Sequence, residues 1–525
     1  MCFTFELKMT SDKETPSTRT KSDFKIEVHD ILPSFSGKYE IEKFLGEGRY
    51  GKVAQCLKLG SKEKIAIKIV RKKYTHNGKK EVHMLRQLIG LDLNKHNLVT
   101  FIEHFRYRGH ICLAFEMLDI SLWDLMKERT FKPMNLSEIR VIAQQLLVAL
   151  EALKRIGLVH GDIKMDNVML VNHKSQSLKL KLIDFGLAKN VSMLRRGTVM
   201  QALGYRAPEV ILGLPLREAI DMWGVGCVVA FLYLGTHVYS TQCEYEVLRA
   251  IVQVQSQPED RMLTPGMFTP VFFKKIQDKP PSWRLKTKTE YETTTGTCTI
   301  PFNVVGLRRY MLFSLDGMTR FCGGMRDHAE FEDKAAFVSI MKQMLHVDYK
   351  KRITPEEALG HRFITLRHFK HDTNSPYVTS ANVTIEKCSL EMSSAEYMPF
   401  VTPSEPMSLK FVSIPSSDDT SSPDESMGSL DETCAHPTNR PKAAVRRPAA
   451  NNRPPANNAP THVHKAASPS SVKRNLPRAT SKEDSSGLVE VKCGKTFFKR
   501  VGRFFSRMRE YPTFMKTSWR HHTAG

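Results

Sequence analysis

Short apolar runs with strand-like alternation fill residues 39–118 of the 525-residue chain. The runs lie at residues 39–46, 51–59, 63–70 and 110–118. Between them, Lys79–Gly90 has helical spacing, with apolar residues at Val82, Leu85, Leu88 and Ile89. The pattern predicts a small, largely antiparallel sheet accompanied by one helix.

Helical patterns dominate after residue 118. Leu136–Gly157 is a long amphipathic stretch, with Ser137 as the expected N-cap and Gly157 as the expected stop. Further apolar runs predict a hairpin from residues 168–172 and 180–186, and core helices at Ile220–Leu234 and Phe337–Leu345. The compact pattern ends near Ile364.

The segments on either side of this region are polar or low in complexity. Such compositions bury too little apolar surface to offset the entropy lost on ordering, so they are expected to be disordered. The predicted organisation is a disordered lead-in at 1–38, a domain at 39–364 with lobes 39–118 and 119–364, a disordered linker at 365–490 and a basic amphipathic segment at 491–525.

The last segment contains an amphipathic pattern, Lys495–Arg509, whose other face is basic. Its apolar face comprises Phe497, Phe498, Val501, Phe504, Phe505 and Met508. Four interpretations stay open: a helix on an anionic membrane, a target for a calmodulin-like partner, a docking segment for the chain's own folded domain, or a helix without a partner. So large an apolar face is unsuited to phosphate contacts, so no direct nucleic-acid partner is expected.

Composition narrows the class of protein. The net charge of +23 indicates anionic partners, although a basic tail beside an ordinary domain accounts for it equally well. Ten cysteines without a CxxC pair indicate reduced thiols in the nucleus or cytoplasm rather than disulfides or a zinc site. No secretory signal is expected at the start, and the most apolar run, Met222–Gly235, is too short to span a membrane.

Gly46, Gly48 and Gly51 form a G-x-G-x-x-G turn between two predicted strands. Glycine lets backbone N–H groups approach a triphosphate closely, but alone the turn is weak evidence, since such turns often serve only a tight hairpin. Lys68 on the next strand is placed to meet the α- and β-phosphates, and Glu81 on the following helix is its natural ion-pair partner.

The second predicted lobe supplies the remaining chemistry in the expected order. Asp162 can accept or orient the proton of an incoming hydroxyl, and Lys164 can steady the γ-phosphoryl group. Asn167 and Asp184 are oxygen ligands suited to Mg²⁺, and Ala207–Glu209, "APE", closes the activation segment. Because these elements occur together in a fixed order, they predict a protein kinase fold: α+β and bilobal, with a small β-rich N-lobe and a larger helical C-lobe.

The chain resembles eukaryotic protein kinases of the proline-directed group, which includes the cyclin-dependent and mitogen-activated kinases. Within that group, the resemblance is to the homeodomain-interacting protein kinases, over about Tyr39–Ile364. It is carried by Ala207–Gly235, Glu244–Gln255 and Pro281–Thr287, with support from Cys112–Leu118 and Lys351–Leu359. The residues after 366 carry little recognisable resemblance.

The resemblance implies a role for each matching position. ATP would be bound by Leu45, Gly46, Gly48, Gly51, Val53, Ala66, Lys68, Glu81, Glu116, Leu118 and Leu170, with Phe115 as gatekeeper. Catalysis would fall to Asp162 and Lys164, and Mg²⁺ binding to Asn167 and Asp184. Asp221 would brace the catalytic loop, and Glu209 would pair with Arg352. The acceptor would be a Ser or Thr of a protein substrate, followed by Pro.

The activation segment departs from this family. Gly161 stands where many kinases have an arginine that grips an activation-segment phosphate, but the family also has a small residue there. Val199 replaces the tyrosine that the family phosphorylates, and Leu203 replaces the arginine that would hold it, whereas the second expected contact, Arg206, is present. Two explanations stay open. One is that Val199 contacts Leu203 or the lobe surface, and that this hydrophobic contact replaces the ion pair of phosphotyrosine with arginine. The other is that the enzyme is weakened and the constraint on these two positions is relaxed. Thr198 is a candidate regulatory phosphorylation site.

Two hypotheses for function follow. One is an active Ser/Thr protein kinase, and the other is a nucleotide-binding scaffold that acts through its helical lobe and tail. A scaffold would be expected to lose Lys68, Asp162, Asn167 or Asp184, and all four are intact. The sequence therefore favours catalysis.

Overall fold

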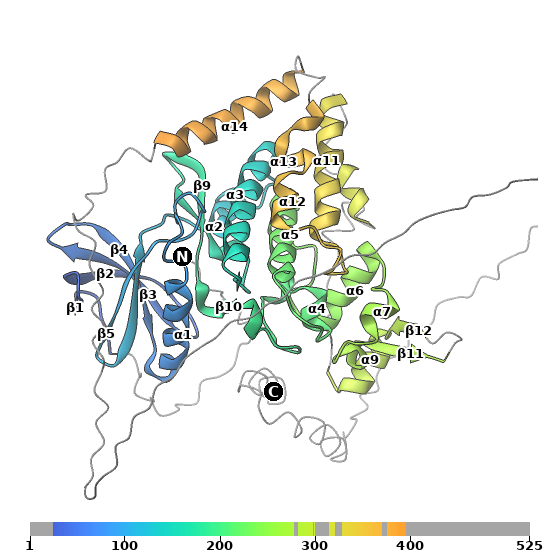
Figure 1. The fold of residues 1–525 in the computed structure, drawn as a ribbon, viewed down its shortest axis with the longest axis horizontal. Coiled ribbons are helices and arrows are strands. Elements are labelled where there is room, and N and C mark those ends of the chain that lie inside the picture. The colour runs from blue at the N-terminus through green and yellow to red at the C-terminus, as the bar shows by residue number, and fades with distance from the viewer. Residues whose placement is uncertain are drawn as a thin grey trace, which may run out of the picture. The chain divides into compact units, whose positions relative to one another are not determined.

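The structure is a computed structural model and describes residues 25–277, 282–297, 299, 314–320, 328–369 and 375–394 (Figure 1). All of them belong to one compact unit. The amphipathic pattern predicted at Lys495–Arg509 lies outside the described residues. None of the described helices is both long and apolar enough to cross a bilayer.

A six-stranded antiparallel sheet forms the N-lobe, in the order β1-β2-β3-β4-β6-β5. Its strands are β1 (Ile31–Pro33), β2 (Lys38–Glu47), β3 (Gly51–Leu59), β4 (Lys64–Val70), β5 (Phe101–Tyr107) and β6 (His110–Glu116). The predicted strands are thus confirmed. The prediction of disorder throughout residues 1–38 is wrong for β1, because Leu32 is fully buried and pairs with Tyr39 on β2.

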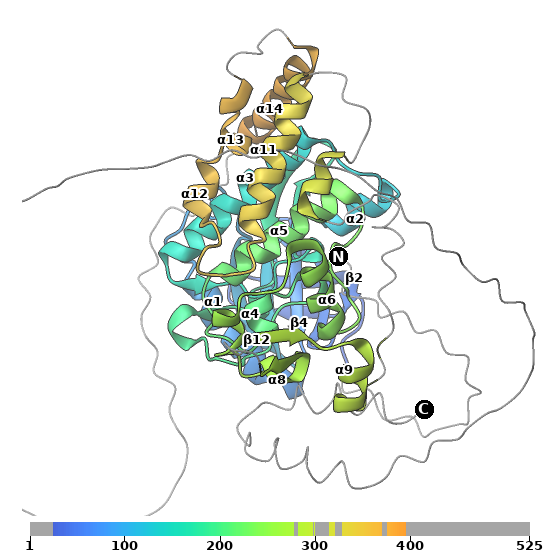
Figure 2. The same cartoon turned by 90° about the vertical axis from the view of Figure 1, so that its right-hand side faces the viewer.

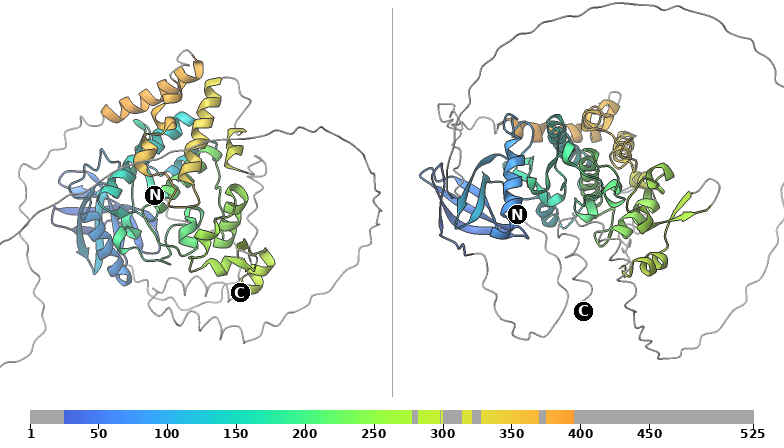
Figure 3. Two further views of the ribbon diagram at one scale, coloured as in Figure 1. Left: turned by 45° about the vertical axis from the view of Figure 1, so that its right-hand side comes forward. Right: turned by 60° about the horizontal axis from the view of Figure 1, so that its bottom comes forward.

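The N-lobe helix α1 spans Thr75–Arg86, so it begins and ends four residues before the predicted Lys79–Gly90. Val82 and Leu85 are buried, as the pattern predicted, on a helix that contacts β6. Ile89 was placed on the same face, but it lies beyond the helix end and is 75% exposed. Both views in Figure 3 show this lobe, in blue, beside the helical lobe.

The long helix α3 (Leu136–Arg155) runs through the helical lobe. Its N-cap is Asn135, not the predicted Ser137. The Asn135 side chain accepts a hydrogen bond from Glu138 N at 2.9 Å, and the Glu138 carboxylate accepts one from Asn135 N at 3.0 Å. This reciprocal capping box fixes the helix start two residues earlier than Ser137, which is buried inside the first turn. Gly157 follows the helix end with a left-handed φ of +68°, as a stop residue should.

Two further core helices confirm the predicted apolar runs. Every residue of α5 (Ala219–Leu234) after the first is buried, and α11 (His328–Met344) packs against it. A Cβ at Gly226 would lie 2.7 Å from Leu345 Cδ2, so a larger residue there would have to displace the Leu345 side chain. The predicted hairpin is formed by β8 (Val168–Asn172) and β9 (Gln176–Leu182), and β9 begins and ends four residues before the predicted 180–186.

The other described helices and strands of the helical lobe include a group at the end away from the N-lobe, which faces the viewer in Figure 2. They are α2 (Leu122–Glu128), β7 (Leu158–Val159), β10 (Lys189–Asn190), α4 (Pro208–Ile211), α6 (Glu244–Gln255), α7 (Asp260–Leu263), α8 (Thr269–Phe272), β11 (Phe273–Ile276), β12 (Ser282–Leu285), α9 (Lys288–Thr295), α12 (Pro355–Leu359) and α13 (Arg362–Thr365). The predicted bilobal α+β fold is confirmed.

A helix follows the predicted end of the domain. Helix α14 spans Pro376–Ser394 and packs on α3 and β9 (Figure 1). Its residues Val378, Ala381 and Cys388 are buried. The prediction of disorder from residue 365 is therefore wrong for α14, because an apolar stripe at helical spacing is buried there despite the polar overall composition.

Candidate active site

The glycine-rich turn joins β2 and β3. Gly48 N donates a hydrogen bond to Gly51 O at 2.8 Å, which closes the turn. A Cβ at Gly51 would lie 2.0 Å from the backbone oxygen of Ile69, so no other residue fits without moving β4. Gly46, which follows Leu45 on β2, pairs across the hairpin with the buried Val53.

Lys68 connects the two lobes. It extends from β4, and its Nζ donates to Glu81 Oε1 on α1 at 2.6 Å and to Asp184 Oδ1 at 2.7 Å. Asp184 precedes the 3₁₀ turn η3 (Phe185–Leu187), which α1 contacts. The three residues that the sequence proposed for one site are thus brought together from a strand, a helix and a loop.

Lys68 and Asp184 stabilise each other's charge, whereas burial raises the pKa of Glu81 despite the nearby Lys68 ammonium. Burial alone would lower the pKa of Lys68, but the Asp184 and Glu81 carboxylates outweigh it and raise the pKa above its ordinary value. Burial alone would raise the pKa of Asp184, but the Lys68 ammonium holds it at about 2. At neutral pH the site therefore holds a charged lysine and a charged aspartate.

The side chains that are expected to contact the nucleobase are apolar and buried. Val53, Ala66 and Leu170 are almost completely buried, as is Leu118 beyond the end of β6. Ala66 pairs with Phe115, the expected gatekeeper, which packs against Phe101 with ring centroids 5.6 Å apart.

Glu116, the other expected hinge residue, is held through its side chain. Its carboxylate accepts hydrogen bonds from Lys181 Nζ at 2.6 Å and from Thr100 N at 2.5 Å. These bonds fix the strand end from which the backbone contacts to adenine are expected. The contacts of Glu116 and Leu118 with a nucleobase stay predictions.

The catalytic loop lies between β7 and the 3₁₀ turn η2 (Met165–Asn167). Asp162 Oδ2 lies 3.1 Å from Lys164 Nζ. Asn167 Nδ2 donates to Asp162 O at 2.8 Å and to Asp162 Oδ2 at 3.0 Å. Burial raises the pKa of Asp162, and Lys164 opposes that rise. The carboxylate is therefore oriented from two sides and is a suitable group to accept or orient a hydroxyl proton.

Asp221 at the start of α5 holds the same loop through its backbone. Its carboxylate accepts hydrogen bonds from His160 N at 2.7 Å and Gly161 N at 2.8 Å. The His160 ring in turn lies 3.0 Å from Ile183 O and packs edge-on against Phe185. The loop is thus linked to both α5 and the segment around Asp184.

Glu209 and Arg352 form a fully buried ion pair. Arg352 Nη1 and Nη2 donate to the two Glu209 oxygens at 2.6 and 2.9 Å. Arg352 also donates to Ala219 O at 2.7 Å and stacks over Trp223. The paired guanidinium therefore ties the end of the activation segment to the start of α5.

Arg206 was expected to contact an activation-segment phosphate, but it has other partners. Its Nε and Nη2 donate to Met200 O at 3.0 Å and Gln201 O at 2.7 Å, and its Nη1 donates to Glu244 at 2.6 Å. Thr198 lies two residues before Met200 and is half-buried. The guanidinium is thus occupied by the backbone of the segment itself and by α6.

Sequence reasoning missed Met200 and Gln201, which are almost completely buried, whereas Val199 and Leu203 are only half-buried. Gln201 has a left-handed φ of +67°. Its side chain donates to Ile220 O at 2.9 Å and accepts from Ala207 N at 3.0 Å. In the sequence, Met200 and Gln201 are a methionine and a glutamine within a loop-like segment, and neither residue type alone predicts burial there.

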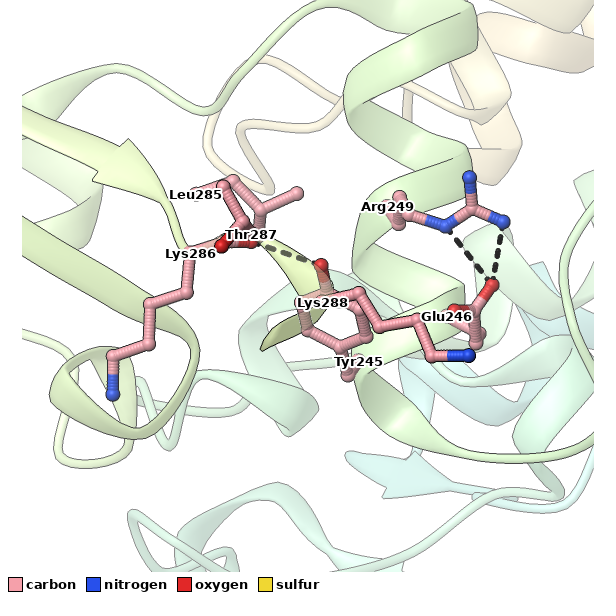
Figure 4. Close-up of a pocket in the computed structure, with 7 residues that line it drawn as sticks. All are labelled: Tyr245, Glu246, Arg249, Leu285, Lys286, Thr287 and Lys288. Carbon is pink, nitrogen blue, oxygen red and sulfur yellow. Dashed lines mark hydrogen bonds and ion pairs between the residues drawn. The ribbon is translucent and has the colours of Figure 1, made fainter. Parts of the chain in front are cut away.

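A cavity of about 380 Å³ elsewhere in the helical lobe is lined by none of these residues (Figure 4). Residues of α6 and of the β12–α9 junction line it: Tyr245, Glu246, Arg249, Leu285, Lys286, Thr287 and Lys288. Arg249 pairs with Glu246 at 2.7 Å, and Tyr245 OH donates to Lys286 O at 2.9 Å. Lys286 Nζ donates to the backbone oxygens of Pro270 and Val271, and Lys288 pairs with Glu292, which does not line the cavity.

The comparisons with known proteins agree with the fold and the site. A model of the protein kinase domain matches residues 39–364. Homeodomain-interacting protein kinase 2 of Mesocricetus auratus is 39% identical over 379 residues, which cover 71% of this chain and 32% of that protein. Homeodomain-interacting protein kinase 1 of Caenorhabditis elegans is 36% identical over 400 residues, 72% of this chain and 47% of that protein.

A third relative has a lower sequence identity, but the match covers more of its length. Homeodomain-interacting protein kinase 4 of Homo sapiens is 33% identical over 360 residues, 65% of this chain and 58% of that protein. The chain therefore spans from about a third to about three fifths of the length of these curated relatives.

Proposed function

Because this chain belongs to the protein kinase family, we propose that it is an active serine/threonine kinase that transfers the γ-phosphoryl group of ATP to protein substrates. One observation carries the proposal: Lys68 Nζ lies 2.6 Å from Glu81 and 2.7 Å from Asp184, so residues of both lobes that are expected to bind nucleotide and metal lie together. Asn167 donates to Asp162, and Asp162 lies close enough to Asp184 for the two carboxylates to interact electrostatically. Phosphoryl transfer depends on positioning and charge neutralisation, which this arrangement can supply.

The donor set fits a divalent cation, and we propose Mg²⁺. Asn167 uses its amide nitrogen on Asp162, which leaves the amide oxygen to face a cation. Asp184 accepts from Lys68 and Gly186 N through Oδ1, so Oδ2 is the oxygen it would offer. Hard oxygen donors with few protein ligands are typical of Mg²⁺ sites completed by substrate phosphates. When bound, the ion would neutralise phosphate charge.

The chain's own residues then divide the work. Lys68, held by Glu81, would position the α- and β-phosphates. Asp162 would orient the acceptor hydroxyl and accept its proton, and Lys164 beside it would stabilise the charge on the transferred group. The apolar surfaces of Val53, Ala66 and Leu170 would contact the nucleobase.

Phosphate incorporation into a generic protein substrate tests this proposal. The purified full chain with Mg-ATP is expected to phosphorylate it, and Lys68→Met and Asp162→Asn are each expected to lower the rate at least about a hundredfold. Nucleotide binding should survive in Asp162→Asn, because the proposed contact of that side chain is with the acceptor hydroxyl and not with the nucleotide. Equal incorporation by wild type and Asp162→Asn, or none by either with nucleotide still bound, would instead favour the scaffold hypothesis.

We further propose that the acceptor is followed by proline. Gln201 N donates to Gly161 O at 3.1 Å, so Gln201 lies beside the loop that carries Asp162. The Gln201 carbonyl already accepts from Arg206 at 2.7 Å. A substrate residue after the acceptor would find that oxygen occupied, and proline is the residue that has no N–H to satisfy.

Paired peptides test this preference. A Ser-Pro peptide is expected to have a kcat/KM roughly ten times or more above its Ser-Ala counterpart, since a desolvated N–H without a partner costs about 1–3 kcal/mol. The preference should shrink in Arg206→Gln, which frees the Gln201 carbonyl. Equal kcat/KM for both peptides in the wild type would contradict the assignment.

The partner and compartment predictions stay proposals. A membrane or calmodulin-like partner for Lys495–Arg509 concerns residues outside those described. Nuclear localisation rests on similarity to the homeodomain-interacting kinases and on a weak basic patch at residues 439–448.

A further inference from the structure

Gly161, the residue before Asp162, leaves a space that Met200 fills. Gly161 has a left-handed φ of +72°. A Cβ built on it would lie 2.2 Å from Met200 Cε and 3.4 Å from Leu187 O. Atoms do not approach that closely, so the Met200 methyl group occupies the volume that any side chain at 161 would need. The glycine and the methionine are therefore sterically matched.

Two hydrogen bonds of the Gly161 backbone hold this residue in place against Met200. Gln201 N donates to Gly161 O at 3.1 Å, and Gly161 N donates to Asp221 at 2.8 Å. Gly161 is thus fixed between the activation segment and α5. Because Asp162 is the next residue, a shift of Met200 would be transmitted to the backbone that carries the catalytic carboxylate.

The activation segment around Met200 is satisfied without a phosphate. Arg206 donates to Met200 O and Gln201 O and pairs with Glu244. The Gln201 side chain bonds Ile220 O and Ala207 N. Met200 is 4% exposed and Gln201 is 3% exposed. The guanidinium that could have gripped a phosphate is already used for this purpose.

We propose that Met200, seated against Gly161, is the positioning residue that holds the activation segment in its catalytic arrangement without phosphorylation. This inference rests on the proposed kinase function. It replaces the expected contact between Val199 and Leu203 with one between the activation segment and the catalytic loop. Kinase activity is accordingly independent of phosphate on Thr198 or on any other residue of the segment.

Steady-state kinetics of full-length variants test the steric match. Met200→Ala removes the contact and is expected to lower kcat about tenfold or more, with the KM for Mg-ATP within about twofold, because the nucleotide residues are untouched. Met200→Leu, which refills most of the space, should restore kcat to within about threefold of wild type. Met193→Ala is the matched control, because Met193 lies in the same segment but is 62% exposed; its kcat should equal that of wild type.

The complementary change at Gly161 adds a result that a merely destabilising mutation cannot produce. Gly161→Ala drives a Cβ into Met200 and should lower kcat. Combining it with Met200→Ala removes the clash, so the double variant should be more active than Gly161→Ala alone. Recovery is expected to be partial, because alanine is strained at a φ of +72°. Strictly additive or worse losses would overturn the proposal. Should Met200→Ala unfold, judged by melting temperature, the comparison of Met200→Leu with Gly161→Ala decides in its place.

Removal of phosphate tests the regulatory consequence. Protein treated with a broad-specificity phosphatase, verified by mass spectrometry, and the Thr198→Ala variant should both keep the kcat of untreated wild type. A fall in either to the level of Met200→Ala would show that phosphate, not Met200, holds the segment. A wild type inactive under all conditions, like Asp162→Asn, would refute the kinase function itself. An active wild type indifferent to Met200→Ala would refute this inference alone.

Discussion

Asp221 shows how one buried side chain can control the geometry of the catalytic loop without contacting a substrate. It accepts hydrogen bonds from His160 N and Gly161 N, and burial raises the pKa of its carboxyl. Asp221→Ala leaves two buried N–H groups without partners, each at a cost of about 1–3 kcal/mol. We expect a lower melting temperature and a kcat reduced at least about tenfold.

Asp316→Ala provides the comparison for that variant. Asp316 pairs with Lys342 at 3.0 Å, and its side chain is 65% exposed. Exposed ion pairs contribute about 0–1 kcal/mol, so this change should leave the melting temperature and kcat nearly unaltered. Similar effects of the two variants would show that the loop does not depend on Asp221.

The residues of the candidate site divide into those that sequence could predict and those it could not. Lys68, Asp162 and Asp184 stand in motifs whose spacing follows from local strand, loop and turn geometry. Met200 depends on the approach of two segments about forty residues apart, and no local pattern encodes that approach. The N-cap error at Ser137 has a local cause, since Asn135 and Glu138 form a capping box that was already visible in the sequence.

At the scale of elements, a buried charge cluster links α14 to the domain. Asp333 on α11 pairs with Arg140 on α3, and it accepts from His368 Nε2 at 2.9 Å and from Tyr377 OH at 2.8 Å. Tyr377 lies in the first turn of α14. The carboxylate therefore joins three helices and the turn η7 (Arg367–Phe369) through a single buried group.

Asp333→Asn is expected to destabilise the chain by about 3–5 kcal/mol, because it leaves the buried Arg140 without its counter-charge. Burial alone would raise the pKa of Asp333, but the hydrogen bond from His368 and the Arg140 charge lower it below its ordinary value. The stabilisation is therefore present in full above the ordinary aspartate pKa of about 3.9 and is lost as pH falls through the lower folded value.

Melting curves across pH measure this effect. The gap in melting temperature between wild type and Asp333→Asn should be wide at neutral pH and should narrow below about pH 4. Asp316→Asn, which removes an exposed carboxylate, should show almost no gap at any pH. A gap that stays constant down to acid pH would mean that the charge of Asp333 does not hold the cluster.

Helix α14 also shows where a compositional argument fails. The region after residue 365 is polar on average, but Ser375 and Pro376 are helix-start signals. Ser375 Oγ accepts a hydrogen bond from Tyr377 N at 3.1 Å. Val378, Ala381 and Cys388 then recur at helical spacing and are buried. Averaging over a long window concealed a short segment with its own pattern.

For the whole molecule, the order of motifs along the chain was sufficient to predict two lobes, because each motif of this kind requires a particular element to carry it. The boundaries were harder to predict. Strand β1 and helix α14 both lie outside the predicted range 39–364, and both are held by tertiary contacts with elements inside it. A three-residue strand such as β1 is too short to show an alternation pattern of its own.

The net charge of +23 belongs to the whole chain, and the Lys495–Arg509 segment is where charge and apolar residues coincide. We predict that the full chain binds vesicles containing anionic lipid more tightly than neutral vesicles, with an affinity that falls as salt rises. Phe504→Glu should weaken binding at least about tenfold, because it places a charge in the predicted apolar face. Sedimentation with vesicles of both compositions measures this.

Ser506→Glu separates the loss of apolar surface from the change in charge. It makes the same change in charge as Phe504→Glu, but on the opposite side of the predicted helix. It should therefore weaken binding only about as much as one surface charge does, about 1 kcal/mol. Equal losses from both variants would mean that the segment binds through charge alone and does not insert. Equal binding of the wild type to anionic and neutral vesicles would contradict the membrane interpretation, and would favour a protein partner for the same apolar face.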